Sequence, residues 1–215
     1  MQKDLSNYRK SYQKSELLED AISDNPMEVF QKWFHEVEAT DGVDEPNAMT
    51  VSTIGLDGYP KSRVVLMKKF TFEGFIFYTN YLSEKGKAIA NNPNVCLAFF
   101  WPNLERQVLI KGKAEKLATN LSDGYFESRP RGSQLGALVS AQSEPIKSRQ
   151  ALEERLVALE KELENKEIER PKHWGGYLVR PVSIEFWQGR PNRLHDRIRF
   201  SLQENLDWKI ERLQP

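Results

Sequence analysis

The sequence contains one cysteine, Cys96, so no disulfide can form within the chain. A lone cysteine is typical of a protein in a reducing compartment. The sequence also has no excess of either charge, because 31 Lys and Arg residues balance 31 Asp and Glu residues. Proteins that bind nucleic acids usually carry a basic excess, so this balance argues against that class and leaves only a local basic patch as an alternative.

Long apolar segments are absent as well. No stretch approaches the roughly 18 consecutive apolar residues that indicate a membrane-spanning helix. The first residues, Met1-Gln2-Lys3-Asp4-Leu5, lack the apolar core of a secretory signal. We therefore expect a soluble, cytoplasmic protein with neither a membrane nor a nucleic-acid partner.

The common catalytic and metal-binding motifs are also missing. The three histidines, His35, His173 and His195, include no pair at metal-ligand spacing, and with one cysteine a zinc or iron site is not expected. The sequence has no Gly-x-Ser-x-Gly element and neither a Walker nor a Rossmann glycine pattern. Any ligand must therefore be held by side chains and strand edges.

The regular elements that are present favour strands. Asp24-Asn25-Pro26 predicts the start of a helix, with a capping side chain followed by proline in the first turn. Five strands follow with hairpin-sized turns, over residues 49–54, 62–68, 75–79, 95–101 and 105–116. The fourth is almost entirely apolar, and we expect it to be covered on both faces. This close spacing predicts an antiparallel barrel or sandwich.

The second half of the chain begins with helices. Helices are predicted over residues 121–128 and 133–140, and Ser148 is predicted to cap a third. Strands return from Gly176 to Glu211. The predicted fold class is therefore α+β and mainly β. Residues 1–20 are expected to form a mobile arm that folds over a site, the alternative being a frayed chain terminus. Residues 21–215 are expected to form a single domain with a helical insert around 119–165.

The stretch from Ile184 to Arg197 is predicted to form two short strands joined by a polar turn. Because side chains alternate along a strand, Arg193, His195 and Arg197 would share one face of the second strand. Two guanidinium groups beside an imidazole would suit an anionic ligand.

A first anion site is predicted near Arg63, Lys68 and Lys85. Ser83 is predicted to cap a short helix, and Lys85 is in the first turn of that helix, where backbone N–H groups favour an anion. The hydroxyls of Thr79 and Ser83 could add donors. Alternatively, Lys85 is a solvated surface lysine. Arg63 is harder to explain in that way, because a half-buried guanidinium within an apolar run needs a partner.

Tyr125, Arg129, Arg131 and Ser133 suggest a second anion site around a helix boundary. The alternative is that the two arginines satisfy free carbonyls at a helix C-terminus. Two other residues are ambiguous in the same way. Gln107 and Trp187 are either parts of a packed core or groups that contact a planar heterocycle.

Six segments together resemble the pyridoxine/pyridoxamine 5′-phosphate oxidase family, in the family's order and from about Tyr8 to Pro215. They are Arg63-Val64-Val65-Leu66-Met67-Lys68, Phe77-Tyr78-Thr79-Asn80, Glu105-Arg106-Gln107-Val108, Tyr125-Phe126-Glu127-Ser128-Arg129-Pro130-Arg131, Gln142-Ser143, and Glu185-Phe186-Trp187-Gln188-Gly189 with Arg193-Leu194-His195-Asp196-Arg197. Each segment alone is a weak signal, but six in order with the family's spacing are specific.

The resemblance implies an FMN-binding split barrel, antiparallel and of Greek-key type with flanking helices, that works as a homodimer with its active sites at the subunit interface. It implies that FMN is held by Arg63, Val64, Val65, Leu66, Met67, Lys68, Tyr78, Thr79, Lys85, Gln107, Gln142, Ser143, Trp187 and Arg197. It implies that the substrate phosphate is bound by Lys68, Tyr125, Arg129 and Ser133. Arg193, Leu194 and His195 would lie at the pyridine ring, with Arg193 and His195 in catalytic roles, and Arg9 and Tyr12 would close as a lid.

The implied reaction is oxidation of pyridoxamine 5′-phosphate or pyridoxine 5′-phosphate by O2 to pyridoxal 5′-phosphate, with release of hydrogen peroxide, in vitamin B6 salvage. The flavin would carry the difficult chemistry. The alternatives are another FMN split-barrel reductase and a non-catalytic carrier of FMN or pyridoxal 5′-phosphate. One position departs from the family, which usually has arginine where this chain has Glu84, so FMN would be held by fewer cations or by a substitute residue.

Overall fold

The computed structural model describes residues 3–215. The arm that we predict over residues 1–20 therefore includes two residues outside the described part of the chain. The elements are η1 (Glu19–Ala21), α1 (Pro26–Glu38), β1 (Ala48–Ile54), β2 (Pro60–Leu66), β3 (Lys69–Thr71), β4 (Gly74–Asn80), α2 (Glu84–Asn91), β5 (Asn94–Trp101), β6 (Arg106–Lys116), α3 (Thr119–Glu127), α4 (Arg131–Val139), α5 (Arg149–Glu162), β7 (Trp174–Gln188), η2 (Pro191–Arg193), β8 (Asp196–Leu202) and β9 (Trp208–Arg212). A mainly β fold with helices is confirmed.

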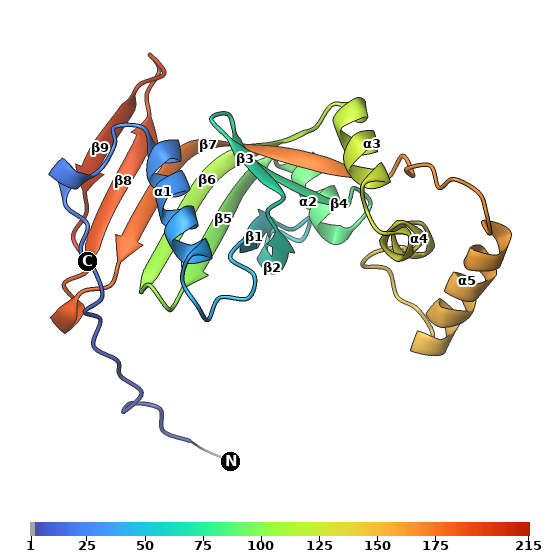
Figure 1. Ribbon diagram of the computed structural model, residues 1–215, viewed down its shortest axis with the longest axis horizontal. Coiled ribbons are helices and arrows are strands. Elements are labelled where there is room, and N and C mark those ends of the chain that lie inside the picture. The colour runs from blue at the N-terminus through green and yellow to red at the C-terminus, as the bar shows by residue number, and fades with distance from the viewer. Residues whose placement is uncertain (1–2) are drawn as a thin grey trace. The chain divides into compact units, whose positions relative to one another are not determined.

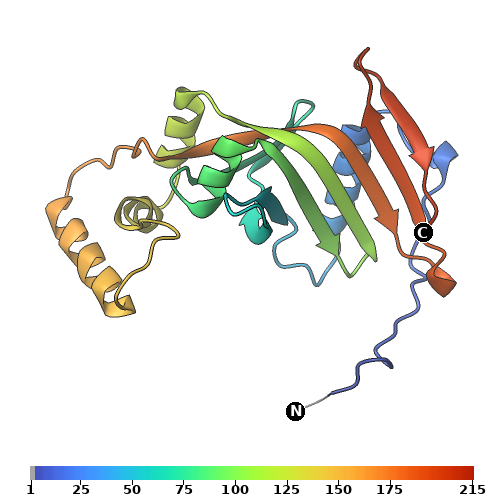
Figure 2. The same cartoon turned by 180° about the vertical axis from the view of Figure 1, so that it is seen from behind.

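The strands form one sheet with the order β2-β1-β5-β6-β7-β4-β3, and β8 pairs with β7 and with β9. The β3–β4, β4–β7, β7–β8 and β8–β9 pairs are antiparallel. The long strand β7 pairs with β4 through its first half and with β8 through its second half. Its path is visible in Figures 1 and 2 as the long orange strand that leads to the C-terminal hairpin.

The chain divides into two compact units. Unit 1 contains the residues up to Thr50, together with Leu97–Lys111 and Pro181–Pro215. Unit 2 contains Val51–Cys96 and Gly112–Arg180. Strands β1, β5, β6 and β7 each begin in one unit and end in the other.

Unit 1 is built around α1. The side chain of Asn25 caps this helix by accepting a hydrogen bond from the Met27 N–H, and Pro26 occupies the first turn. Its apolar stripe then packs on the strands. The Phe30 ring lies 5.2 Å from that of Phe99, and the Trp33 ring lies 5.2 Å from that of Phe186. Burial of these aromatic side chains accounts for the position of α1.

Unit 2 has its own apolar cluster, formed by Phe126, Leu135, Ile168 and Trp174. Partly buried leucines of α5 and its C-terminal end, Leu156, Leu159 and Leu163, pack against this cluster. The face of α5 that carries these leucines therefore packs on this cluster. The predicted helix starts are confirmed at Ser83 and Ser148, whose side chains accept from the Gly86 and Ala151 N–H groups.

The structure corrects the predicted second strand of the 184–197 stretch. Residues Pro191–Arg193 form a short 3-10 helix, and β8 begins only at Asp196. Asn192 and Arg193 take φ values of +57° and +62°, in the left-handed region, and these break the extended conformation. Arg193 is therefore the last residue of the 3-10 helix, His195 lies in the connection before β8, and the alternation with Arg197 does not apply to them.

Two further strand predictions need correction. The apolar strand β5 is not covered on both faces, because its residues alternate in burial and Phe100 is 56% exposed. The strand predicted over residues 62–68 ends at Leu66, and Met67 and Lys68 connect β2 to β3.

Candidate functional site

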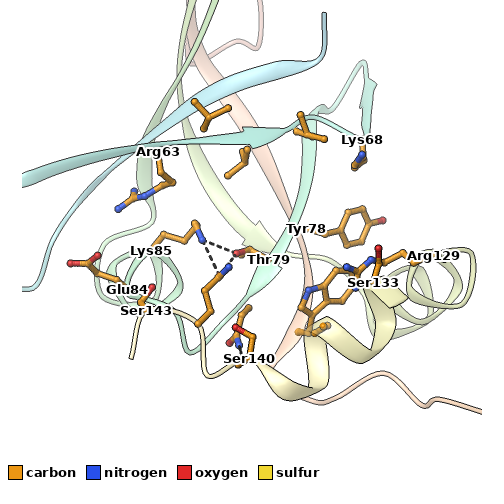
Figure 3. A pocket seen from close by; sticks show the side chains of 18 of the residues that line it. Arg63, Lys68, Tyr78, Thr79, Glu84, Lys85, Arg129, Ser133, Ser140 and Ser143 are labelled. Carbon is orange, nitrogen blue, oxygen red and sulfur yellow. Dashed lines mark hydrogen bonds between the residues drawn. The ribbon is translucent and has the colours of Figure 1, made fainter. Parts of the chain in front are cut away.

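A pocket of about 780 Å³ lies within unit 2 and opens between β2, β4, α2 and the α3–α4 region (Figure 3). It combines basic side chains with hydroxyl, amide and aromatic groups. The lining residues are Lys61, Ser62, Arg63, Val64, Val65, Leu66, Lys68, Tyr78, Thr79, Asn80, Glu84, Lys85, Tyr125, Arg129, Ser133, Gly136, Ala137, Ser140, Gln142, Ser143 and Trp174.

Lys85 is held at the start of α2 and is 9% exposed. Its ammonium donates a hydrogen bond to Thr79 Oγ1 at 3.0 Å, drawn as a dashed line in Figure 3, and another to Gln142 Oε1 at 3.1 Å. Burial, and then the charge of Arg63, lower the pKa of Lys85 against the opposing effect of Glu84. Lys85 is thus a buried cation whose hydrogen-bond partners are neutral, and the alternative of a solvated surface lysine is wrong.

Arg63 projects from β2 and is also held by neutral oxygens. Its Nη1 donates to Thr53 Oγ1 and to the Lys61 carbonyl, both at 2.8 Å. Burial lowers the pKa of Arg63, while the nearby Glu84 carboxylate raises it. Two cations with neutral partners in one pocket create a site suited to an anion.

Glu84, the acid that departs from the family pattern, forms an ion pair with Lys61. Both residues line the pocket, and both side chains are about half exposed, at 47% and 55%. Glu84 therefore has a basic partner of its own, while its charge also raises the pKa of Arg63 and of Lys85.

An aromatic stack forms the other side of the pocket. The rings of Tyr78 and Tyr125 are stacked at 3.8 Å, and the Tyr78 and Trp174 rings at 5.6 Å. The guanidinium of Arg129 lies over the Trp174 ring at 4.4 Å. In Figure 3, Arg129 and Ser133 lie on the opposite side of the pocket from Arg63 and Lys85.

The two arginines of the α3–α4 boundary behave differently. Arg131 donates to the carbonyls of Leu163, at 2.6 Å, and of Lys166, at 3.0 Å. It therefore satisfies carbonyls beyond the C-terminal end of α5. Arg129 instead lines the pocket, and its Nη1 is buried with no hydrogen-bond partner among residues 3–215.

Most of the residues predicted to bind the cofactor or the substrate phosphate line this one pocket. Ser143, at its rim, takes a left-handed φ of +75°. Met67 is an exception within the 63–68 run, because its side chain is 3% exposed and it is not among the lining residues. Gln107, Trp187 and Arg197 belong to unit 1 and are not among them either.

A second cluster of predicted site residues lies within unit 1. The Trp187 and His195 rings lie 4.7 Å apart, and the Tyr12 ring contacts each of them edge-on at 5.7 Å. Leu194 is 69% exposed, and Arg193 is exposed beside it. Arg197 pairs with Glu185 at 2.8 Å, and the exposed Arg9 donates to the Ser6 carbonyl at 3.0 Å. The structure thus brings Tyr12, Trp187 and His195 together.

Glu105 fastens the N-terminal segment to unit 1. Its buried carboxylate accepts hydrogen bonds from the Gln13 and Lys14 N–H groups, at 2.8 and 3.1 Å, and pairs with Lys10 at 3.3 Å. Burial raises the pKa of Glu105, but these donors outweigh burial and leave it below its ordinary value. The contact holds Tyr12 at the Trp187–His195 pair.

Sequence reasoning did not select three of these residues as part of a site. Two of them, Lys61 and Trp174, line the pocket and belong to none of the six segments. The third, Glu105, fastens the arm; it opens one of those segments, but no role is predicted for it. The pair of Lys61 and Glu84 is separated by 23 positions, and Glu105 acts on residues more than 90 positions away. Only the fold brings them to their partners.

Comparison with known proteins decides the family. The model described as pyridoxamine 5′-phosphate oxidase matches residues 36–161, and the model described as pyridoxine 5′-phosphate oxidase C-terminal dimerisation region matches residues 174–215. The chain belongs to the pyridoxine/pyridoxamine 5′-phosphate oxidase family. A family member from Flavobacterium psychrophilum is 70% identical over 99% of this chain and 100% of its own length. One from Christiangramia forsetii is 54% identical over the full length of both.

Solved structures support the same fold. PhzG from Burkholderia lata, in complex with tetrahydrophenazine-1-carboxylic acid, is 27% identical with a TM-score of 0.86, covering 94% of this chain and 100% of that one. A pyridoxamine 5′-phosphate oxidase-related, FMN-binding protein from Nostoc punctiforme is 15% identical with a TM-score of 0.70, covering 91% and 99%. The predicted split-barrel fold is confirmed.

Two kinds of feature are absent from residues 3–215. No group of three or more His, Cys, Asp or Glu side chains is placed to hold a metal ion. No helix in this part of the chain is both long and apolar enough to cross a membrane.

Proposed function

We propose that this chain is an FMN-dependent oxidase that converts pyridoxamine 5′-phosphate and pyridoxine 5′-phosphate to pyridoxal 5′-phosphate. One observation carries the proposal. A single pocket holds Arg63 and Lys85 on one side and Arg129 on the other, and all three cations contact neutral groups. Two separated sets of cations suit two phosphate esters, one of a flavin nucleotide and one of a phosphorylated pyridine.

The residues on the Lys85 side fit the FMN phosphate. The N-terminus of α2 offers backbone N–H groups, and Lys85, Arg63 and Thr79 supply charged and hydroxyl donors. A buried ammonium whose hydrogen-bond partners are neutral gains most from an anion, because a phosphate would compensate its burial. Tyr78, Gln142 and Ser143 line the same pocket and would complete this end.

Bound FMN would supply the redox chemistry, by taking a hydride equivalent from C4′ of the substrate and passing both electrons to O2. The amine substrate consumes water and releases ammonia and hydrogen peroxide, whereas the alcohol substrate releases only hydrogen peroxide. The protein then needs to bind and orient the substrate. That task does not itself require an acid–base pair or a metal.

The substrate phosphate would bind at the other end of the pocket. Arg129 provides a guanidinium with an unused buried donor, and Lys68, Tyr125 and Ser133 line the pocket beside it. Charge-assisted hydrogen bonds of this kind are stronger than neutral ones and would select phosphorylated over free vitamers.

The second cluster would act on the pyridine ring from the partner subunit of a homodimer. The segment that matches the family's dimerisation region, residues 174–215, carries Trp187, Arg193, His195 and Arg197. In a dimer, these residues of one subunit would complete the pocket of the other. Arg193 would position C4′ of the substrate. Arg9 and Tyr12 belong to the N-terminal arm that Glu105 fastens, and this arm would close over the substrate.

Oxygen uptake tests this function. The purified protein, saturated with FMN, should consume O2 and release peroxide with pyridoxamine 5′-phosphate and with pyridoxine 5′-phosphate. NADPH should give no comparable uptake, since a reductase of the same fold would prefer it. An FMN-loaded protein that consumes O2 with NADPH alone would be a reductase, and one inert with all three substrates would be a carrier.

A further inference from the structure

Trp174, the first residue of β7, belongs to an aromatic stack with Tyr78 and Tyr125. It is 7% exposed. Its ring is nearly parallel to those of Tyr125, at 6.2 Å and 6°, and Tyr78, at 5.6 Å and 13°. The Phe126 ring meets it edge-on at 5.3 Å. The indole is therefore fixed on several sides, and it also lines the pocket.

A charged side chain also lies against the Trp174 ring. The guanidinium of Arg129 lies 4.4 Å from the centre of the indole ring, within the distance of a cation–π interaction, for which tryptophan is the best partner. The Phe126 ring gives a second, more distant contact at 5.7 Å. Burial lowers the pKa of Arg129, and the nearby Tyr125 opposes that effect. The indole face therefore offsets part of the cost of burying this charge.

The way in which Arg129 is held leaves its donors unused. Its Nη1 is buried without a hydrogen-bond partner in the described chain, and a buried donor of this kind is costly. Arg131, two residues further on, shows the contrast, because its donors are taken by the Leu163 and Lys166 carbonyls. A carboxylate partner for Arg129 would occupy the same donors that a phosphate needs. An aromatic face supports the charge and leaves those donors free.

We propose that Trp174 is a positioning residue that holds the Arg129 guanidinium ready for the phosphate of the substrate. The inference rests on the proposed function and deepens it. It assigns to Trp174 a share of the preference for phosphorylated over non-phosphorylated substrate, although the indole need not touch the phosphate. Without the indole ring, the Arg129 side chain could shift or reorient toward solvent, and the phosphate would lose a preorganised partner.

The test compares two substrates in the FMN-saturated protein. Trp174→Leu should raise the KM for pyridoxamine 5′-phosphate roughly twofold to thirtyfold, the range of a partly buried cation–π contact. The kcat/KM for pyridoxamine, which lacks the phosphate, should stay the same. Trp174→Phe should give a KM between those of the wild type and of Trp174→Leu, because a phenyl ring makes a weaker cation–π contact than an indole. The Trp174→Phe variant alone is sufficient for the test if Trp174→Leu does not fold.

A double substitution separates positioning from packing. In an Arg129→Ala background, Trp174→Phe should cost nothing further with pyridoxamine 5′-phosphate, since the group that it positions is gone. Equal losses with both substrates, or the same loss with and without Arg129, would overturn the inference. An unchanged KM in the Trp174 variants would do so too. A wild-type protein that oxidises neither substrate would instead refute the proposed function itself.

Discussion

The backbone N–H of Arg190 donates a hydrogen bond to Nδ1 of His195 over 3.0 Å. An imidazole nitrogen that accepts a hydrogen bond carries no proton, so His195 is neutral in this arrangement and its proton is on Nε2. Burial, and then the charge of Arg193, lower the pKa of His195, and Asp196 opposes them. The neutral ring can therefore offer an N–H donor on the side away from Arg190.

We expect the pKa of His195 to lie below the value of about 6.5 that histidine has in an unfolded chain. Because the folded protein favours the neutral form, its contribution to stability is full above about pH 6.5 and is lost as the pH falls from there toward the lower folded pKa. An NMR titration of the imidazole, assigned with the His195→Gln variant, measures this directly. A pKa above that of a free histidine would contradict the assigned tautomer.

Lys85→Ala should weaken FMN binding by about tenfold to a hundredfold, the value of a charge-assisted hydrogen bond to phosphate. Quenching of FMN fluorescence on titration into apoprotein gives the Kd. Lys87→Ala is the matched control, because Lys87 is in the same helix and pairs with Glu144 at the surface. Equal effects of the two substitutions would remove Lys85 from the cofactor site.

Arg129→Ala should raise the KM for pyridoxamine 5′-phosphate by about tenfold to a hundredfold, since a charged hydrogen bond to the phosphate is lost. Arg131→Ala removes an equal charge two residues away. Because the Arg131 guanidinium donates its hydrogen bonds to backbone carbonyls, this variant should have a KM near that of the wild type. Steady-state oxygen uptake measures both. An unchanged KM in Arg129→Ala would contradict the phosphate assignment.

Local signals in the sequence were enough for much of the fold. Asn25, Ser83 and Ser148 each cap the helix that the sequence predicts at that place. Such signals act within a few residues, so they can be recognised without knowledge of the tertiary structure. The cations of the pocket were also accessible to sequence reasoning, because charges within apolar strands or at a helix start are unusual.

The predictions that failed depended on backbone conformation or on distant contacts. Alternation along a strand placed Arg193 and His195 on one face, but two successive residues with positive φ break that strand. Trp174 gave no signal at all, because a buried tryptophan in sequence resembles any core residue. Glu105 could not be linked to the N-terminal segment, since its partners lie far away along the chain.

Mixing two impaired variants, assayed at a substrate concentration near the wild-type KM, tests whether each active site uses two subunits. Arg193→Ala should lose most turnover while it keeps FMN, because we propose that Arg193 orients the substrate. If the pocket and the Arg193 cluster come from different subunits, a hybrid dimer of Arg193→Ala and Arg129→Ala contains one intact site. Unfolding and refolding an equal mixture should then restore about a quarter of the wild-type activity. No recovery in a mixture that is shown to contain hybrids would place both residues in the site of one chain.

Anaerobic mixing of the FMN-loaded protein with pyridoxamine 5′-phosphate tests the central claim most directly. We predict that the yellow flavin absorption bleaches, that about one pyridoxal 5′-phosphate forms for each flavin reduced, and that admitted O2 restores the colour with release of peroxide. A protein that binds no FMN, or whose bound flavin stays oxidised in the presence of this substrate, would contradict the account.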